Sequence, residues 1–353
     1  MAFKTAAGYG NLPNGNFSPV IYSKQVQLAF RKKSVVEEIT NSDYFGEISA
    51  MGDTVRIIKE PEITVKEYAR GAQITPQDLD DEDFSLVVDK ANYFAFKVDD
   101  IEEAHSHVNF GEMASNRAAY RLSDQFDQEV LGYLSGWKQS SLSSVAGTAN
   151  DTVSGTKAVS SAGSDELLDS MLVDANDFNG GTAGNSIVVK PRAGGDSLNT
   201  TTANATPLAV IARMSRKLDQ QYVPSSDRWL VVDPVFAELM KDEDSRLFQS
   251  DWGGSGLQNG LILNNVHGFK VFMSNNLPAK GNGATGATAT GSTHFGVICA
   301  GHSSAVATAE QINKTESYRD PDSFADIVRG MHLYGRKILK PEALSRAYYV
   351  SGF

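Results

Sequence analysis

Cysteine occurs only once in this sequence of 353 residues, at Cys299. A single cysteine excludes an intramolecular disulfide and any zinc site built from several cysteines, so we expect Cys299 to be a small buried apolar side chain. The sequence also lacks a run of about 18 apolar residues, and no apolar stretch follows Lys4. We therefore expect neither a membrane span nor a secretion signal, and we expect folding in the cytosol.

Acidic residues are absent from positions 1–36, where the five charged residues are all basic: Lys4, Lys24, Arg31, Lys32 and Lys33. The whole chain has a formal net charge of −11, so removing this +5 segment leaves −16 for residues 37–353. A basic segment beside an acidic body can lie on an acidic neighbour or on nucleic acid, or it can be a solvated tail. The acidic total argues against a dedicated DNA-binding domain, because phosphate contacts require clustered lysine and arginine. Any contact with nucleic acid should therefore be local and nonspecific.

Two strand-like segments are separated by a long polar connection. Residues 53–60 and 84–98 are rich in Val, Ile and Phe and partly alternate, as strands do. The connection alternates at Ile63 and Val65 and then carries five acids between Asp78 and Asp83, so it is too polar to be buried alone. We expect a long projecting hairpin. Because a two-stranded ribbon is marginal in water, a surface outside the monomer must stabilise it.

A long helix is predicted after the second strand segment. Asp99 with Glu102 resembles a capping box, and an apolar stripe at steps of three or four residues continues to Leu134. At about 1.5 Å per residue the helix would span roughly 50 Å, which suits a spine that crosses the whole subunit. The opposite side of this helix is expected to face water through its charged residues Arg117, Arg121, Asp124, Asp127 and Glu129.

The remaining chain predicts a mixed α/β (α+β) protein. Residues 138–206 are rich in Ser, Thr and Gly, with a short helix near DELLDSML and a strand at SIVVK. Thr206 is a plausible N-cap before Pro207, and Asp233 with Pro234 marks another helix start. The expected strands of this part are RWLVVD, VHGFKVFMS as a hairpin arm, FGVICA, AVATAEQI and DIVRGMHLYGRKIL.

Several motifs resemble ligand-binding sites, but each lacks a feature that binding of the ligand requires. GNGATG at 281–286 matches GxGxxG, but ATATGS follows it instead of the required helix. The acidic run ending at Asp83 lacks the central glycine of a calcium loop. His105 and His107 are two residues apart on a helix and so face different directions, which disfavours a shared metal. We predict no catalytic, cofactor-binding or metal site.

The strongest enzyme alternative is a serine hydrolase that uses Ser303. GHSSA at 301–305 follows a strand as a nucleophile elbow does, and Asp320, Asp322 or Asp326 followed by His332 supplies the chain order of a triad. Against this alternative, Ala305 replaces the second glycine and the next residues alternate like a strand. A turn between two strands is the preferred interpretation.

The order of segments resembles the major capsid proteins of tailed bacteriophages, which have the HK97-type fold. One part of the resemblance is VVDP at 231–234 followed by a helix and then NNVHGFKVFMSNNLP. The most specific part is a C-terminal set of residues: Arg319, Asp320, Pro321, Phe324, Asp326, Arg329, Gly330, Tyr334, Gly335, Lys337, Pro341 and Glu342. The resemblance covers nearly the whole chain.

The resemblance implies a division of the chain into five parts. They are an N-terminal arm at 1–50, an extended hairpin loop at 51–98, a peripheral domain with the spine helix and a loop-rich segment at 99–206, an axial domain at 207–300, and a return to the peripheral sheet at 301–353. Some relatives join a lysine of this loop to an asparagine of a neighbour. Although Lys59, Lys66, Lys90 and Asn313 are present, nothing marks them as a pair, so no crosslink is expected.

The implied function is self-assembly into hexamers and pentamers of an icosahedral head shell around a phage genome. An encapsulin-like nanocompartment is the alternative with the same architecture. The implied partners are other copies of the chain, a separate scaffolding protein, a portal, a decoration protein and, nonspecifically, packaged double-stranded DNA, with assembly in the host cytoplasm and final location in the virion. The candidate contact residues are Arg31, Lys32, Lys33, Lys59, Lys66, Arg70, Asp78, Asp80, Asp81, Glu82, Asp83, Arg319, Asp320, Arg329, Arg336 and Lys337.

Overall fold

The structure is a computed structural model of the chain. It describes residues 34–41, 54–58, 63–71, 73, 76–77, 83–99, 110–136, 167–178, 186–190, 204–241, 257–258, 261–262, 265–280, 294–321 and 325–351.

The described helices are α1 (Val36–Ile39), α3 (Phe110–Ser135), α4 (Pro207–Gln220) and α5 (Pro234–Lys241). Short 3₁₀ turns lie at Asp169–Met171, Ala175–Asp177, Ser303–Ala305 and Pro341–Ala343. The strands are β1 (Thr54–Ile58), β2 (Asp83–Val87), β3 (Lys90–Asp99), β4 (Leu172–Val173), β5 (Ile187–Val189), β6 (Asn204–Ala205), β7 (Arg228–Val232), β8 (Leu257–Gln258), β9 (Leu261–Ile262), β10 (Asn265–Val266), β11 (Phe269–Met273), β12 (Ala279–Lys280), β13 (Phe295–His302), β14 (Val306–Arg319), β15 (Ala325–Ile338) and β16 (Leu344–Ser351).

A mixed nine-stranded sheet holds most of the core. Its strands run in the order β10-β11-β7-β13-β16-β5-β6, with β12 beside β13 and β4 beside β16. Successive residues of β7 point to opposite faces, as in any strand. Leu230 and Val232 pack with α4 and α5 on one face. Trp229 and Val231 pack with α1 and the C-terminal half of α3 on the other. The sheet therefore lies between two layers of helix.

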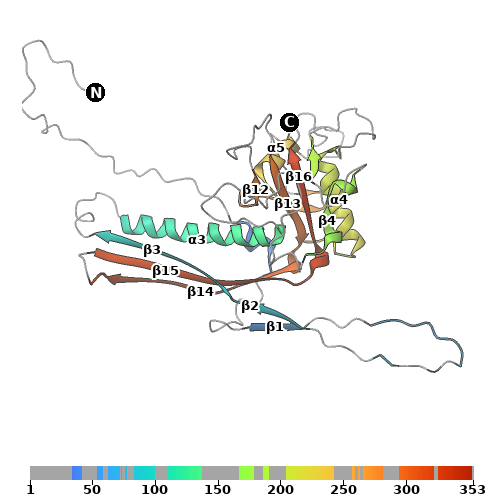
Figure 1. Cartoon of the computed structure of the whole chain (residues 1–353), viewed down its shortest axis with the longest axis horizontal. Coiled ribbons are helices and arrows are strands. Elements are labelled where there is room, and N and C mark those ends of the chain that lie inside the picture. The colour runs from blue at the N-terminus through green and yellow to red at the C-terminus, as the bar shows by residue number, and fades with distance from the viewer. Residues whose placement is uncertain are drawn as a thin grey trace, which may run out of the picture.

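A second sheet of three long antiparallel strands, β14-β15-β3, extends away from the first, and α3 lies along it (Figure 1). The ring of Phe126 on α3 meets the ring of Tyr334 on β15 edge to face, with centroids 4.9 Å apart. The C-terminal half of α3 is buried more fully than the N-terminal half. The mixed α/β class is confirmed.

Two predicted helix starts are confirmed in detail. Thr206 Oγ1 accepts a hydrogen bond from the backbone N–H of Ala209 at 3.3 Å, before Pro207 at the first helical position. Asp233 Oδ1 accepts from the N–H of Phe236 at 3.2 Å. Each cap satisfies a backbone donor that the first helical turn leaves without a partner.

The start of the spine helix falls partly outside the described residues. Asp99 is the last residue of β3, where it is paired with Ala325 of β15. The described helix begins at Phe110, and Glu102 lies outside the described residues. The capping box of Asp99 and Glu102 therefore stays a prediction.

The predicted strands from SIVVK onward are confirmed as β5, β7, β11, β13, β14 and β15. VHGFKVFMS forms the hairpin β10–β11, and β11 also pairs in parallel with β7. The nine-stranded sheet contains strands from three of the expected residue ranges. β4, β5 and β6 come from the range 99–206, and β16 comes from 301–353, yet all four lie in the nine-stranded sheet with strands of 207–300.

Cys299 is buried in β13 at 2% exposure, as the sequence predicts. Burial raises the pKa of its thiol to about 12, although the positive charge of Arg346 partly opposes this shift. Because the thiolate is the reactive form, we expect the native protein at pH 8 not to react with Ellman's reagent. One thiol per chain should react once guanidinium has unfolded the protein. Rapid labelling of the native chain would contradict this burial.

Candidate interaction surfaces

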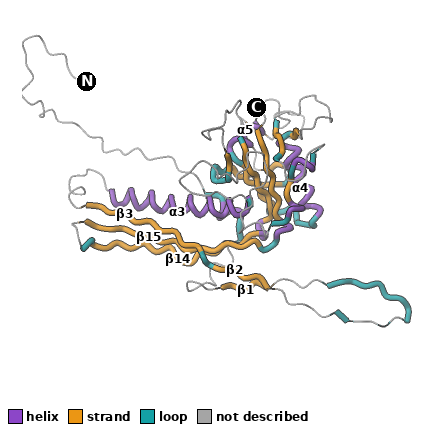
Figure 2. Tube along the Cα trace, in the orientation of Figure 1, coloured by secondary structure: helices purple, strands orange, loops and turns teal. Residues whose placement is uncertain are grey.

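Residues 63–71, in the segment between β1 and β2, project from the body of the protein (Figure 2). They expose apolar side chains. Ile63, Val65 and Tyr68 are 68%, 94% and 63% exposed. Lys66 and Arg70, two of the predicted contact residues, are exposed on the same segment. Apolar side chains gathered on a projecting segment are typical of a surface that meets a partner.

The base of this hairpin is anchored on the three-stranded sheet. β1 and β2 pair antiparallel, from Thr54 opposite Val87 to Ile58 opposite Asp83. Leu86 and Val88 are buried in a small cluster with side chains of β14 and β15, namely Ala307, Ala309 and Leu333. The predicted hairpin is therefore confirmed at its base.

Gly335 on β15 lets the hairpin backbone cross the sheet closely. A Cβ at this position would lie 2.5 Å from the carbonyl oxygen of Val87. We expect Gly335→Ala to displace the hairpin base and to lower the free energy of unfolding by about 1–3 kcal/mol. Limited proteolysis should then cut the hairpin faster. Ser317→Ala, at an exposed position of β14, should change neither property, and equal proteolysis of the two variants would contradict the close crossing.

The face of the three-stranded sheet that is turned away from α3 is partly uncovered. Phe94 and His332 line a cavity beside α3, so the next residues along each strand, Tyr93 and Met331, face the other way. Tyr93 is 80% exposed and Met331 37% exposed. The distal part of the sheet thus offers aromatic and apolar surface beside the region that the hairpin base covers.

The predicted contact residues of this sheet make ion pairs within the chain. Arg329 donates to Glu316 Oε2 at 2.9 Å and lies over the ring of Tyr318 at 5.0 Å. Hydrogen bonding to Glu316, and then its charge, raise the pKa of the Arg329 guanidinium. Two further pairs are Arg319 with Asp326 at 3.5 Å and Lys97 with Asp320 at 2.7 Å. These side chains hold neighbouring segments of the sheet together.

Arg336 is an internal link between β15 and α3. Its Nη1 donates to the backbone oxygen of Glu129 at 2.7 Å and lies 3.3 Å from the Glu129 carboxylate. The guanidinium also lies over the ring of Tyr133, 4.7 Å from its centroid. Only 16% of the Arg336 side chain is exposed, so packing within the chain already accounts for this residue. Lys337, the next residue, is half-buried.

Asp127 on α3 accepts hydrogen bonds from several segments, although the sequence predicted it on the solvated side of the helix. It is fully buried. Its Oδ1 accepts from the backbone N–H groups of Val35 and Val36, both at 3.0 Å, and from Ser34 Oγ at 3.1 Å. Asp127 therefore satisfies the start of α1 from a distant part of the sequence, where α1 has no capping side chain of its own.

The other oxygen of Asp127 reaches the loop that follows β11. Asn276 Nδ2 donates to Asp127 Oδ2 and to Asp124 Oδ1, both at 2.9 Å. Ser274 Oγ donates to Asp127 Oδ2 at 3.4 Å. The carboxylates of Asp124 and Asp127 thus join α1, the spine helix and the nine-stranded sheet. The prediction that both face water is wrong, because each accepts hydrogen bonds from neighbouring segments.

Several predicted contact residues lie outside the described residues: Arg31, Lys32, Lys33, Lys59, Asp78, Asp80, Asp81 and Glu82. Asp83 is described only as the first residue of β2, where it is opposite Ile58. The GNGATG segment, His105 and His107 also lie outside them.

The hydrolase alternative is contradicted by geometry. Ser303 begins a 3₁₀ turn between β13 and β14, where the elbow hypothesis requires an α-helix. His332 is opposite Asn313 on β14, seven residues beyond Val306, which places it on the order of 20 Å from the turn. His332 contacts Glu310 instead, with Nε2 and Oε2 3.4 Å apart. Ser303 and His332 therefore cannot act as nucleophile and base.

Among the described residues, no three His, Cys, Asp or Glu side chains are grouped so that they could hold a metal ion. No helix in the described ranges is both long enough and apolar enough to cross a membrane.

Comparison with known proteins identifies the family. A family model described as phage capsid protein matches residues 162–347, which is more than half of the chain. A search of curated protein sequences gives no match.

Solved structures match nearly the whole chain. A structure from Mycobacterium phage Che8 has a TM-score of 0.66 at 23% identity, covering 94% of this chain and 97% of that one. The capsid structure of the cyanophage P-SCSP1u has a TM-score of 0.62 at 18% identity, covering 96% of this chain and 94% of that one. The mature capsid of bacteriophage PhiM1 has a TM-score of 0.61 at 15% identity, covering 94% and 92%. The chain has the HK97-type fold and belongs to the phage capsid protein family, whose members are structural proteins.

Proposed function

We propose that copies of this chain assemble into hexamers and pentamers of an icosahedral head shell that encloses a phage genome. The observation that carries the proposal is the exposed apolar segment with Ile63, Val65 and Tyr68 on a projecting hairpin. The described part of the same chain leaves these side chains uncovered, and a neighbouring copy would cover them. The uncovered sheet face with Tyr93 and Met331 is the surface that such a hairpin would meet.

The two larger sheets of the described residues would have different roles in the shell. The nine-stranded sheet would form the axial domain near the centre of each ring, and the three-stranded sheet with α3 would form the peripheral domain. One subunit can form rings of five and of six only if its contacts tolerate small changes of angle. A hairpin that projects from a rigid base suits this requirement, since its distal part can move while β1 and β2 stay anchored.

Charged residues would contribute many weak contacts rather than a few strong ones. Lys66 and Arg70 on the hairpin, and the basic segment with Arg31, Lys32 and Lys33, would meet acids of neighbouring copies such as Asp78 to Asp83. Arg319, Asp320 and Arg329 would present the ion pairs of the sheet to the same neighbours. Lys59 and Lys337 are further candidates for such contacts, whereas Arg336 is already bound within the chain. Exposed pairs are individually weak, but repetition around a closed shell adds them together.

The proposed partners are a separate scaffolding protein, a portal, a decoration protein and packaged double-stranded DNA, the last without sequence preference. Assembly would take place in the host cytoplasm before the shell becomes part of the virion.

Light scattering of the purified full chain, with and without a scaffolding protein, tests the proposal. Particles of megadalton mass, or discrete rings, are expected, and electron micrographs should show closed polyhedral shells. A stable monomer of 38.1 kDa at every salt concentration, with scaffolding protein present, would overturn the proposal.

A further inference from the structure

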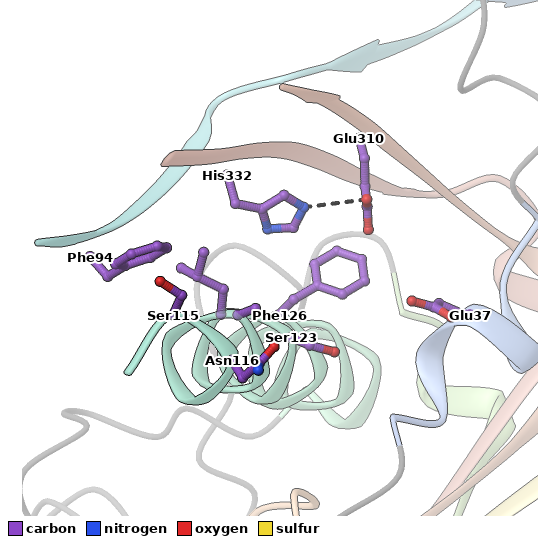
Figure 3. Close-up of a pocket in the computed structure, with 10 residues that line it drawn as sticks. Glu37, Phe94, Ser115, Asn116, Ser123, Phe126, Glu310 and His332 are labelled. Carbon is purple, nitrogen blue, oxygen red and sulfur yellow. Dashed lines mark ion pairs between the residues drawn. The ribbon is translucent and has the colours of Figure 1, made fainter. Parts of the chain in front are cut away.

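A cavity of about 340 Å³ lies between α3 and the inner face of the three-stranded sheet, with Glu37 of α1 on its border (Figure 3). Its lining includes Ser115, Asn116 and Ser123 from α3 and Phe94 and His332 from the sheet. The proposed contacts between subunits use other surfaces, namely the distal part of the hairpin and the opposite face of the sheet.

One polar atom in this cavity has no hydrogen-bond partner. His332 is 6% exposed, and its Nδ1 is buried without a donor or acceptor beside it. The ring is held in place by Phe126 and Tyr334, with centroids 5.6 and 5.2 Å away. Figure 3 shows Nδ1 on the side of the ring that faces α3, away from Glu310. Buried polar atoms usually have partners, so this one marks a position for a missing group.

Glu310 determines which hydrogen-bonding group the cavity receives. Its carboxylate oxygen lies 3.4 Å from His332 Nε2 and can only accept a hydrogen bond, so it favours the tautomer of the ring with the proton on Nε2. In the neutral ring Nδ1 then presents a lone pair to the cavity. A group that enters must therefore donate a hydrogen bond there.

The charged and apolar residues that line the cavity restrict the chemical class of the ligand further. Glu37 and Glu310 are the charged residues that line it, and both are acids, whereas Lys and Arg are absent from its lining. Phe94, Leu122 and Phe126 add apolar and aromatic surface. An anion has no positive partner here, and the described residues contain no three-ligand group for a metal ion. A compact organic cation with an apolar stem fits all of these features.

We propose that this cavity binds a primary alkylammonium group. The ammonium head has three N–H donors and no acceptor, so one N–H can meet His332 Nδ1 while its charge is balanced by the carboxylates. The alkyl stem would lie along Phe94 and Leu122, and the aromatic rings also attract a cation. The group can belong to a free polyamine or to a lysine side chain of a second copy.

Titration calorimetry with pentan-1-amine and the unassembled full chain tests the proposal. One saturable site per chain is expected. Pentan-1-ol has the same length without the charge, and it should bind at least about tenfold more weakly, because hydrogen bonds to charged groups are the stronger kind. Glu310→Gln and His332→Phe should each weaken amine binding by about tenfold or more. Glu238→Gln removes the same charge from an exposed position of α5 and should leave binding unchanged.

Thermal melting of each variant shows whether it is folded. Glu310 is one-third exposed, so Glu310→Gln keeps the test decisive even if the buried His332→Phe does not fold. Repeating the titration on assembled shells distinguishes a free amine from a lysine side chain of a second copy as the natural ligand. Binding to shells as well as to free chains indicates a free amine, whereas binding to free chains alone indicates that a lysine of a second copy fills the site. Equal affinity for the amine and the alcohol, undiminished binding by Glu310→Gln, or no saturable binding to the free chain would each overturn the proposal.

Discussion

Replacing both Ile63 and Val65 with aspartate should abolish shell formation and leave the subunit folded. Both side chains are mostly exposed in the single chain, so the folded subunit loses little packing. Between subunits the same positions would become buried, and an unpaired carboxylate is costly to bury. The loss is repeated at every copy around the shell, so a modest effect per contact becomes complete failure of assembly. Light scattering and electron microscopy measure shells, and thermal melting measures the subunit.

Thr64→Asp is the matched control, because it adds charge between the two positions and removes no large apolar side chain. Its side chain is exposed, and the hydrogen bond to Gln77 uses the backbone N–H of Thr64, which the substitution keeps. We expect Thr64→Asp chains to form shells. Normal shells from the double variant would show that the apolar segment of the hairpin is not a contact surface.

The second large effect is expected from Asp127→Ala. This change removes the acceptor of five donors: Ser34 Oγ, Val35 N, Val36 N, Ser274 Oγ and Asn276 Nδ2. Several of these donors are buried and would be left without a partner, so we expect the free energy of unfolding to fall by about 3–5 kcal/mol. Thermal melting should show a midpoint lower by about 5–10 °C.

Asp127→Asn keeps one carbonyl acceptor and should lose about half as much stability. Its amide must face either the backbone donors or Asn276, so one side of the network is lost. Glu238→Gln removes a carboxylate from an exposed surface and should melt like the original chain. A melting temperature of Asp127→Ala within about 1 °C of the original would show that these hydrogen bonds contribute little.

Local signals explain the features that the sequence predicted well. Thr206 before Pro207 and Asp233 before Pro234 act within a single helical turn, so neighbouring residues contain the whole pattern. The continuous apolar run FGVICA that forms β13 is equally local. The hairpin was predictable because its polar, acid-rich connection could not be buried alone.

Features that depend on distant segments escaped prediction. Asp124 and Asp127 have the spacing of a solvated helix face, and only the folded chain brings Asn276 and the start of α1 against them. Arg336 looked like a surface charge until α3 supplied Glu129 and Tyr133. The cavity beside His332 was equally invisible, since β14, β15, α1 and α3 all contribute to it.

The position of β16 has a consequence for synthesis of the protein. It follows every other described strand in the sequence, yet it lies between β13 and β5 in the interior of the nine-stranded sheet. A ribosome must therefore translate residues 344–351 before the two halves of that sheet can be joined. Fragments that stop earlier lack this interior strand and cannot complete the sheet, so we expect prematurely terminated chains not to reach the folded subunit.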